Sequence, residues 1–541
     1  MAKHEEHRHY TPSDTRVENA EHPKIIDLLP DYGKSWYRVP HLLKLNALLL
    51  VPLLTSYVSG FDGSVINGFQ SLPHWNEDLD YPSGSALGLI STIQVIGGLA
   101  ALPFAPMLAD RFGRRPAILI GSLFIIAGAV LQGAGHTIGT FLGGRGLVGW
   151  GSSFIAVAAA PMIGELAYPS HRPIITAIYN TSWYLGSIVA AWVTYGTFKI
   201  PSGWSWRIPC LLQAAPSLVQ VAFIYLVPES PRWLVAHDRP EEAQEILCRY
   251  HAGSEEPNEL VLAEMNEIKI AIQNETLRNT SSYLKTSMSL DLYDRAHQRF
   301  APSSCLLTCP EAGNRHRLFI CISIGFIIQW CGNGLVSVYP VQVLKSIGIT
   351  DPETQNIING VLQIFNYIVA LASAFFVDRF GRRGLFLFSI AGMTLSFIIW
   401  TAISARNEQQ NFENKGLGIG VITMIFIFFL FYNIAMIPVP MAYLLEVLPY
   451  TLRAKGLTIF NVSQFASVVF NGFANPVALK AIGWKYYIVF ACLLVVWFFV
   501  VFFAYPETRR LSLEEVAVVF DGEDAMREVD AKAVVKKAEE M

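Results

Sequence analysis

The chain has 541 residues, of which 52% are hydrophobic and only 15% are charged, and its formal net charge is −3. Soluble domains carry about 25% charged residues, so this composition excludes a soluble globular protein of the same length. The small net charge gives no reason to expect a nucleic-acid partner. The seven cysteines and twelve histidines form no ligand cluster. We therefore expect no metal site and no other cofactor.

Apolar runs long enough to cross a bilayer, about 20 residues each, recur along the chain. Six precede a polar gap and six follow it, near 43–63, 85–109, 116–134, 139–163, 174–197, 206–228, 316–340, 355–377, 384–405, 417–445, 452–475 and 484–505. They predict an all-α membrane protein with twelve transmembrane helices in two pseudo-symmetric six-helix bundles. The expected segments are a disordered tail at 1–41, bundles at 42–232 and 316–506, a loop at 233–315 and a C-terminal tail at 507–541.

The distribution of Lys and Arg in the short loops predicts the orientation. Arginines follow the second and eighth helices, whereas the loop between Ser64 and Gly84 contains no Lys or Arg. The positive-inside rule therefore places these arginine-rich loops, the central loop and both termini in the cytoplasm. Arg239 to Ile272 in the central loop is Glu/Ala/Leu-rich with helical spacing. This stretch predicts amphipathic helices that lie on the inner face.

The sequence repeats itself between its two halves. Asp110-Arg-Phe-Gly-Arg-Arg115 returns as Asp378-Arg-Phe-Gly-Arg-Arg383, and a Glu with an Arg seven residues later occurs at 165 and at 446. A third pair is Pro228-Glu-Ser-Pro-Arg-Trp-Leu234 and Pro506-Glu-Thr-Arg509. These pairs predict one duplicated six-helix unit.

The charged residues of the repeated motifs lie where helices end at the predicted cytoplasmic surface. A carboxylate can lie at a helix N-terminus, and an arginine can pair with it. Positive-inside topology alone explains the arginines but not the repeated Glu and Arg spacing. We expect a cytoplasmic latch that joins the two halves and breaks when the inside opens. Its members are Asp110, Arg111, Arg114, Arg115, Glu165, Arg172, Glu229, Arg232, Asp378, Arg379, Arg382, Arg383, Glu446, Arg453, Glu507 and Arg509.

These motifs, in this order at these helix ends, resemble the sugar porter family of the major facilitator superfamily. The resemblance covers about 43–510. The stretches 60–68 and 329–334 are similar to the fungal lactose permease and hexose transporter-like branch. The resemblance implies a two-bundle transporter rather than an enzyme.

Asp62 near the end of the first helix and Arg145 in the fourth are ionisable residues within apolar runs. Such residues are costly in a membrane, so a functional role is the default interpretation. We expect the two to form a pair that protonation of Asp62 would break. In the resembled family an aspartate at this position accompanies proton symport. The alternative is that Asp62 lies in an aqueous vestibule and only caps the helix.

Recognition of a sugar requires hydroxyl partners and aromatic faces inside a protein-lined cavity. The candidates are the polar and aromatic residues within the runs: Gln94, Asn180, Trp183, Gln329, Trp330, Asn333, Tyr339, Asn366, Asn433, Tyr443, Gln464 and Phe465. Buried amides can also serve only as contacts between helices. The resemblance implies glutamine where Asn180 stands and tryptophan where Met441 stands. These departures fit a disaccharide, another polyol or a non-sugar metabolite as well as glucose.

The leading hypothesis is a monomeric secondary active transporter that moves a sugar or sugar-like solute together with a proton by alternating access.

 Its partners would be the solute, protons and the surrounding lipid, and the plasma membrane is the expected location. One alternative is an uncoupled facilitator or an exporter of a non-sugar metabolite. A further alternative is a nutrient sensor on a transporter scaffold.

Overall fold

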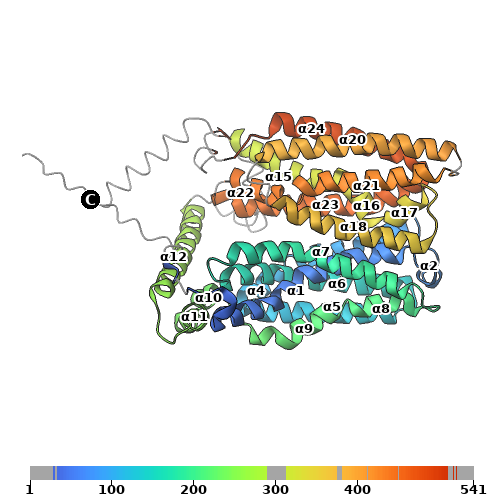
Figure 1. The fold of residues 1–541 in the computed structure, drawn as a ribbon. Coiled ribbons are helices and arrows are strands. Elements are labelled where there is room, and N and C mark those ends of the chain that lie inside the picture. Colours follow the sequence, from blue (N-terminus) through green and yellow to red (C-terminus); the bar gives the residue numbers. More distant parts are fainter. Residues whose placement is uncertain are drawn as a thin grey trace, which may run out of the picture.

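The computed structural model describes residues 28–30, 33–288, 312–374, 380–410, 412, 414–448, 450–509, 516 and 519–520. Every element of two turns or more within these ranges is a helix. Each of the twelve predicted runs corresponds to one helix or to one broken helix. The two halves lie side by side with their helices running in a common direction (Figure 1).

The first half contains six helical rods. They are α1 (Pro40–Phe69), α3 (Ser85–Ala101) with α4 (Ala105–Phe112), α5 (Arg114–Ala134), α6 (Ile138–Leu166), α7 (Arg172–Thr197), and α8 (Trp204–Leu212) with α9 (Ala215–Phe223). The α3–α4 pair bends by 46°. The short helix α2 (Pro73–Asp78) lies between the first two rods.

The second half repeats this arrangement. Its rods are α15 (Ala312–Trp330) with α16 (Asn333–Val338) and α17 (Pro340–Lys345), α18 (Pro352–Ala374), α20 (Arg382–Gln409), α21 (Lys415–Ala435) with α22 (Val439–Val447), α23 (Tyr450–Ile482) and α24 (Tyr486–Ala504). The break between α21 and α22 falls at Pro438, where proline cannot continue the hydrogen-bond pattern of the preceding turn.

Eight stretches of the described chain are long and apolar enough to cross a membrane, or nine if the bent α3–α4 pair is counted as one span. One of them, Gly456–Ala504, covers most of α23 and all of α24. The rods α7 and α15 are outside this set. The fold is therefore that of an all-α membrane protein, while twelve crossings remain a prediction.

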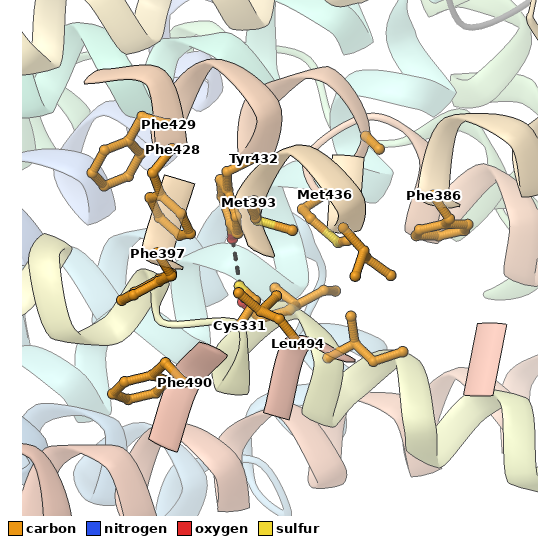
Figure 2. Packing of buried hydrophobic residues seen from close by; sticks show 14 of the residues in the cluster. Cys331, Phe386, Met393, Phe397, Phe428, Phe429, Tyr432, Met436, Phe490 and Leu494 are labelled. Carbon is orange, nitrogen blue, oxygen red and sulfur yellow. Dashed lines mark hydrogen bonds between the residues drawn. The ribbon is translucent and has the colours of Figure 1, made fainter. Parts of the chain in front are cut away.

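Each half packs around its own buried core. In the second half, Phe397 stacks on Trp400 with ring centroids 4.9 Å apart and meets Phe428 edge-on at 5.1 Å. Figure 2 shows Phe397 and Phe428 with Phe490 and Tyr432 in the packed interior. The first half has a separate cluster on α1, α5 and α6. In a bilayer, where lipid tails are as apolar as the side chains, such close packing holds the helices together.

The central loop forms a small helical unit attached to the first half. It contains α10 (Pro231–Ala236), α11 (Pro240–Leu247), the π-helical turn Cys248–Ala252 and α12 (Glu259–Met288). The buried His251 ring lies between the Glu264 carboxylate, at 2.6 Å, and the Leu166 carbonyl oxygen, at 3.2 Å. Because Leu166 ends α6, this contact fixes the loop to the bundle. The expected loop helices are present, whereas their position on a membrane surface stays a prediction.

The repeated motifs lie together at one end of the molecule, which we call the motif end; it is the end with α4, α10 and α22 in Figure 1. In the first half, the Glu229 carboxylate accepts hydrogen bonds from the backbone N–H groups of Arg114 (3.1 Å) and Arg115 (3.2 Å). In the second half, Glu507 accepts those of Arg382 (2.9 Å) and Arg383 (3.1 Å). Each carboxylate thus satisfies the free N–H groups at the start of a helix.

A glycine precedes each of these helix starts. Gly113 has φ 102° and ψ 170°, and Gly381 has φ 81° and ψ 152°. This backbone region is essentially restricted to glycine. A Cβ atom at Gly381 would also lie 2.9 Å from a carboxylate oxygen of Glu507.

We expect Gly381→Ala to lower the melting temperature of the detergent-solubilised protein, because the new methyl group strains the backbone by about 1–3 kcal/mol and crowds Glu507. Gly384→Ala, one turn along α20, is the control, since no atom lies within 4 Å of its added Cβ. Alanine there should be neutral or stabilising by up to about 1 kcal/mol. Equal melting temperatures for the two variants would contradict this account of the motif.

Candidate functional site

An ion pair lies inside the first half. Asp62 of α1 and Arg145 of α6 are both almost completely buried, and Asp62 Oδ1 lies 3.6 Å from Arg145 Nη1. Gln213, at the end of α8, donates to Asp62 Oδ1 at 2.6 Å. Arg145 Nη2 donates to Gln94 Oε1 of α3 at 2.8 Å. Four helices of one bundle therefore supply the two charges and their amide partners.

The pair is only partly satisfied. Asp62 Oδ2 and the Nε and Nη1 atoms of Arg145 have no hydrogen-bond partner among the described residues. Transfer of two charges from water into protein costs several kcal/mol per ion, and removal of one charge leaves the other uncompensated. A change of protonation at Asp62 would therefore act directly on Arg145. Gln213 was not among the candidates, because a single glutamine in an apolar run has no pattern that distinguishes it.

A chain of hydrogen bonds crosses between the halves at Tyr184. Its hydroxyl group donates to Asn433 Oδ1 at 2.8 Å, and Asn433 Nδ2 donates to Asn366 Oδ1 at 3.0 Å. Tyr184 belongs to α7, Asn433 to α21 and Asn366 to α18. Two predicted binding residues are thus brought together, with a tyrosine from the other half that sequence reasoning missed.

A second set of bonds surrounds Asn333, at the start of α16. Its Nδ2 atom donates to the Tyr432 hydroxyl at 3.0 Å, and its Oδ1 atom accepts from Ser337 Oγ at 2.6 Å. Asn67 of α1 donates through Nδ2 to the Ser337 carbonyl oxygen. Gly332, with φ 99°, separates α15 from α16 and allows this turn of the chain. Asn333 is therefore held at a helix break that also contacts the first half.

Other predicted binding residues are spread around this region. The Trp330 ring lies 5.3 Å from that of Phe470, and Asn471 Nδ2 donates to the Gln329 carbonyl oxygen at 2.8 Å. Asn180 and Trp183 are exposed on α7, and Gln464 and Phe465 of α23 are half-buried.

The two tyrosines predicted to bind the solute, Tyr339 and Tyr443, contact other groups of the protein. The Tyr443 hydroxyl donates to the Pro506 carbonyl oxygen at 2.9 Å, and its ring stacks on that of Tyr505. This places Tyr443 beside the motif end, apart from the amides described above. The buried Tyr339 donates to the Gly472 carbonyl oxygen at 2.6 Å, and its ring packs in a cluster formed mainly by first-half residues. Tyr339 thus joins the halves.

In the first half, Glu165 and Arg172 each contact other residues rather than one another. Glu165 lies 4.0 Å from Arg114 and accepts from Ser230 Oγ. Arg172 donates instead to Glu264 of α12 and to the Ala167 carbonyl oxygen, both at 2.9 Å. Glu165 and Arg172 thus have separate partners in this state, because α5 and α10 approach Glu165 first.

The remaining first-half motif residues have local contacts. Asp110 accepts from Arg114 Nη1 at 2.8 Å, and the Arg111 guanidinium lies over the Phe112 ring at 5.5 Å. Arg232 is exposed and lines a pocket of about 120 Å³ together with Glu165 and Arg172.

In the second half, Glu446 has the same kinds of partner as Glu165 has in the first. Glu446 pairs with Arg382 Nη2 at 2.9 Å and accepts from Thr508 Oγ1, as Glu165 does from Ser230. Arg453 Nη2 donates to the Leu445 carbonyl oxygen at 3.0 Å. The Arg509 N–H group donates to Glu507 at 3.1 Å. Asp378 and Arg379 lie outside the described residues.

The described hydrogen bonds and ion pairs of these motifs join helices within one half, or that half to the central loop. The expected latch between halves is thus not seen among the described contacts of this state. The described motif residues organise each half separately, and a latch that joins the halves at the motif end stays a prediction.

The halves meet at the opposite end, which we call the distal end. Glu353 at the start of α18 accepts from the Tyr195 hydroxyl (3.2 Å) and lies 3.1 Å from Lys199 Nζ. Lys480 Nζ donates to Ser83 Oγ at 3.2 Å. The hydrogen bond that Lys199 donates to the Glu353 carboxylate raises the pKa of the exposed Lys199 amine, and the negative charge of Glu353 acts in the same direction. Exposed pairs of this kind contribute about 0–1 kcal/mol each, so they close the distal end reversibly.

Comparison with protein families gives a match to the model described as "Sugar (and other) transporter" over residues 48–520. The sugar transporter STL1 of Saccharomyces cerevisiae is 27% identical over 514 residues, which are 92% of this chain and 84% of the relative. The high-affinity glucose transporter of Kluyveromyces lactis is 25% identical over 499 residues, which are 90% of this chain and 86% of that protein.

Solved structures give the same fold. The inward-open conformation of the xylose transporter XylE from E. coli matches with a TM-score of 0.69 and 20% identity, over 88% of this chain and 100% of that chain. XylE bound to 6-bromo-6-deoxy-D-glucose, described as a proton:xylose symporter, matches with a TM-score of 0.64 and 20% identity, over 88% and 99% of the two chains. The two-bundle architecture is therefore that of the major facilitator superfamily.

Close backbone contact at the distal end can be tested with Gly88 of α3. A Cβ atom there would lie 2.7 Å from the Gly472 carbonyl oxygen and 3.1 Å from Phe473 Cα, both in the other half. We expect Gly88→Val to separate the halves at this end. The measurement is the distance between spin labels at positions 83 and 480, in a Cys492→Ser background because Cys492 is exposed.

The labelled pair should show a longer distance in Gly88→Val than in the parent. Gly196→Val is the matched control, because Gly196 lies in α7 and no atom approaches its added Cβ within 4 Å. An unchanged distance in Gly88→Val would show that the two glycine backbones do not determine the closure.

Proposed function

Because the chain belongs to the family of sugar (and other) transporters, we propose that it moves a polyhydroxylated solute, a sugar or a related compound, together with a proton by alternating access. The observation that carries proton coupling is the buried Asp62–Arg145 pair inside the first half. The positive-inside arginines support a motif end in the cytoplasm. We further propose a monomer in the plasma membrane.

Proton coupling follows from the energetics of the pair. Asp62 Oδ2 has no described hydrogen-bond partner and can accept a proton. Protonation removes the negative charge beside Arg145 and leaves a buried cation, which is unfavourable by several kcal/mol. The bundle can relieve this cost by a rearrangement that hydrates Arg145. Proton binding thereby favours one arrangement of the helices over another.

The amides support a neutral, hydroxyl-bearing solute. Asn333, Asn366 and Asn433 lie on three helices of the second half. Asn333 and Asn433 bond to tyrosine hydroxyls, and Asn366 bonds to Asn433. Amides both donate and accept, as sugar hydroxyls do. No net charge is needed for such recognition. The aromatic pair of Trp330 and Phe470 adds an apolar face beside the amides.

Contacts at the two ends support alternating access. The described polar contacts between halves include those of Glu353 and Lys480 at the distal end, while the motif contacts remain within each half. With the motif end in the cytoplasm, the described state is closed toward the outside. Opening the outside requires that exposed pairs and hydrogen bonds between halves be exchanged for water and that the close packing at Gly88 and Tyr339 separate.

The decisive variant is Asp62→Asn. Asparagine keeps the size of the side chain and a hydrogen-bond acceptor for Gln213 but cannot bind the transported proton. We expect concentrative uptake driven by an imposed pH gradient to fall at least about tenfold in proteoliposomes, whereas exchange of labelled for unlabelled solute continues. Solute-dependent proton entry, followed with a pH-sensitive dye in the lumen, should be lost in parallel.

Asp351→Asn is the matched control. Asp351 is exposed at the distal end, and hydrogen bonds from Thr354 lower the pKa of its carboxyl group. Asparagine can cap α18 in its place, so coupling should be unchanged. Full concentrative uptake by Asp62→Asn would exclude proton symport through this residue and leave the uncoupled facilitator as the function.

A further inference from the structure

A row of amide side chains runs along one face of α18. Gln355, Asn359, Gln363 and Asn366 are all buried. At 100° per residue their positions fall within an arc of about 80°, and the row extends for about 16 Å along the helix. A transmembrane helix with four buried amides on one face bears a cost that packing alone does not explain. Asn366 belongs to the candidate site, whereas the other three have no role in it.

The three outer amides do not behave as contacts between helices. Gln363 Nε2 donates to Asn359 Oδ1 within the same helix, at 3.4 Å. Gln355 Nε2 donates to the Ile349 carbonyl oxygen in the preceding loop, at 2.7 Å. Asn359 Nδ2 and Gln355 Oε1 have no hydrogen-bond partner although both are buried. A buried donor or acceptor without a partner costs about 1–3 kcal/mol, so these atoms are not present for stability.

The position of the row connects it with transport. Glu353, which closes the distal end, lies two residues before Gln355, and Asn366 bonds to Asn433 at the other end of the row. The row therefore extends from the contact that must open to the amides of the candidate site. Asn67 of the first half also has a buried oxygen, Oδ1, without a partner. Unsatisfied donors and acceptors thus occur in both halves near the distal end.

We propose that Gln355, Asn359 and Gln363 form an outer binding subsite for an extended polyhydroxylated solute, such as a disaccharide, when the distal end is open. This proposal rests on the proposed transport of a sugar or related solute. The free Asn359 Nδ2 donates to a hydroxyl oxygen, and the free Gln355 Oε1 accepts a hydroxyl proton. A single hexose bound at Asn366 and Asn433 does not need this row, whereas a second ring extends along it. The subsite therefore determines whether the protein favours disaccharides over monosaccharides.

The test compares disaccharides with monosaccharides in the full-length protein. Uptake of lactose, maltose, sucrose, glucose, galactose and fructose is measured for the wild type and for Asn359→Leu, with KM and maximal rate determined separately. We expect KM for the transported disaccharide to rise about tenfold, the effect of one lost hydrogen bond and an apolar replacement. KM for a hexose should stay unchanged.

Asn356→Leu is the control on the same helix. Asn356 is also buried, but its Nδ2 atom bonds to the Pro352 carbonyl oxygen, and its position lies about 20° outside the arc of the row, beyond that of Gln363. In Asn356→Leu, the ratio of the KM for the disaccharide to the KM for the hexose should equal that of the wild type. The melting temperature separates a structural role from a binding role. Asn359→Leu should melt close to the wild type, because it removes the unpaired Nδ2 donor but also the acceptor of the long Gln363 hydrogen bond.

The outcomes separate this proposal from the proposed function. Hexose uptake without any disaccharide uptake, or an equal change in KM for both classes, would overturn the subsite and leave sugar transport intact. A lower melting temperature with unchanged selectivity would also overturn it. Absence of both uptake and exchange for every sugar tested would reject sugar transport itself, and the subsite with it.

Discussion

A carboxylate at the start of a helix organises the motif end of each half. Glu229 and Glu507 each take the first free N–H groups of a long helix, and a glycine with positive φ allows the carboxylate to approach. The interaction is strong because a charge meets the positive end of the helix dipole. It joins the end of the last rod to the second and third rods of the same half. Each bundle therefore keeps its shape without help from the other.

Because each bundle keeps its own shape, the contact between the halves can be weak. The distal end is closed by exposed pairs such as Lys199 with Glu353 and by close backbone approach at Gly88. None of these contacts is individually strong, since solvent competes for exposed charges. A change in one bundle can therefore alter the contact without unfolding either half. Rigid halves with an exchangeable contact are the physical requirement for alternating access.

The sequence predicted the helices well because bilayer thickness imposes a length and an apolar composition on each run. The duplication was also visible, since the motif that begins at Asp110 repeats letter for letter at Asp378. The contact partners of individual side chains were harder to predict. Glu165 and Arg172 are separated by the break between α6 and α7, so their spacing along the chain does not describe a helix face. Gln213 and Tyr184 were missed because single polar residues acquire meaning only when another helix brings a partner to them.

The two halves bury different kinds of polar side chain. The first half buries the ion pair of Asp62 and Arg145, and the second buries amides on α16, α18 and α21. A charge pair responds to a proton, while amides respond to a neutral solute, so the proposed coupling needs a contact between them. Asn67 provides one: it lies five residues after Asp62 on α1, about 7.5 Å along the axis, and bonds to Ser337 beside Asn333. A shift of α1 that follows protonation of Asp62 would therefore act on the helix break that holds Asn333.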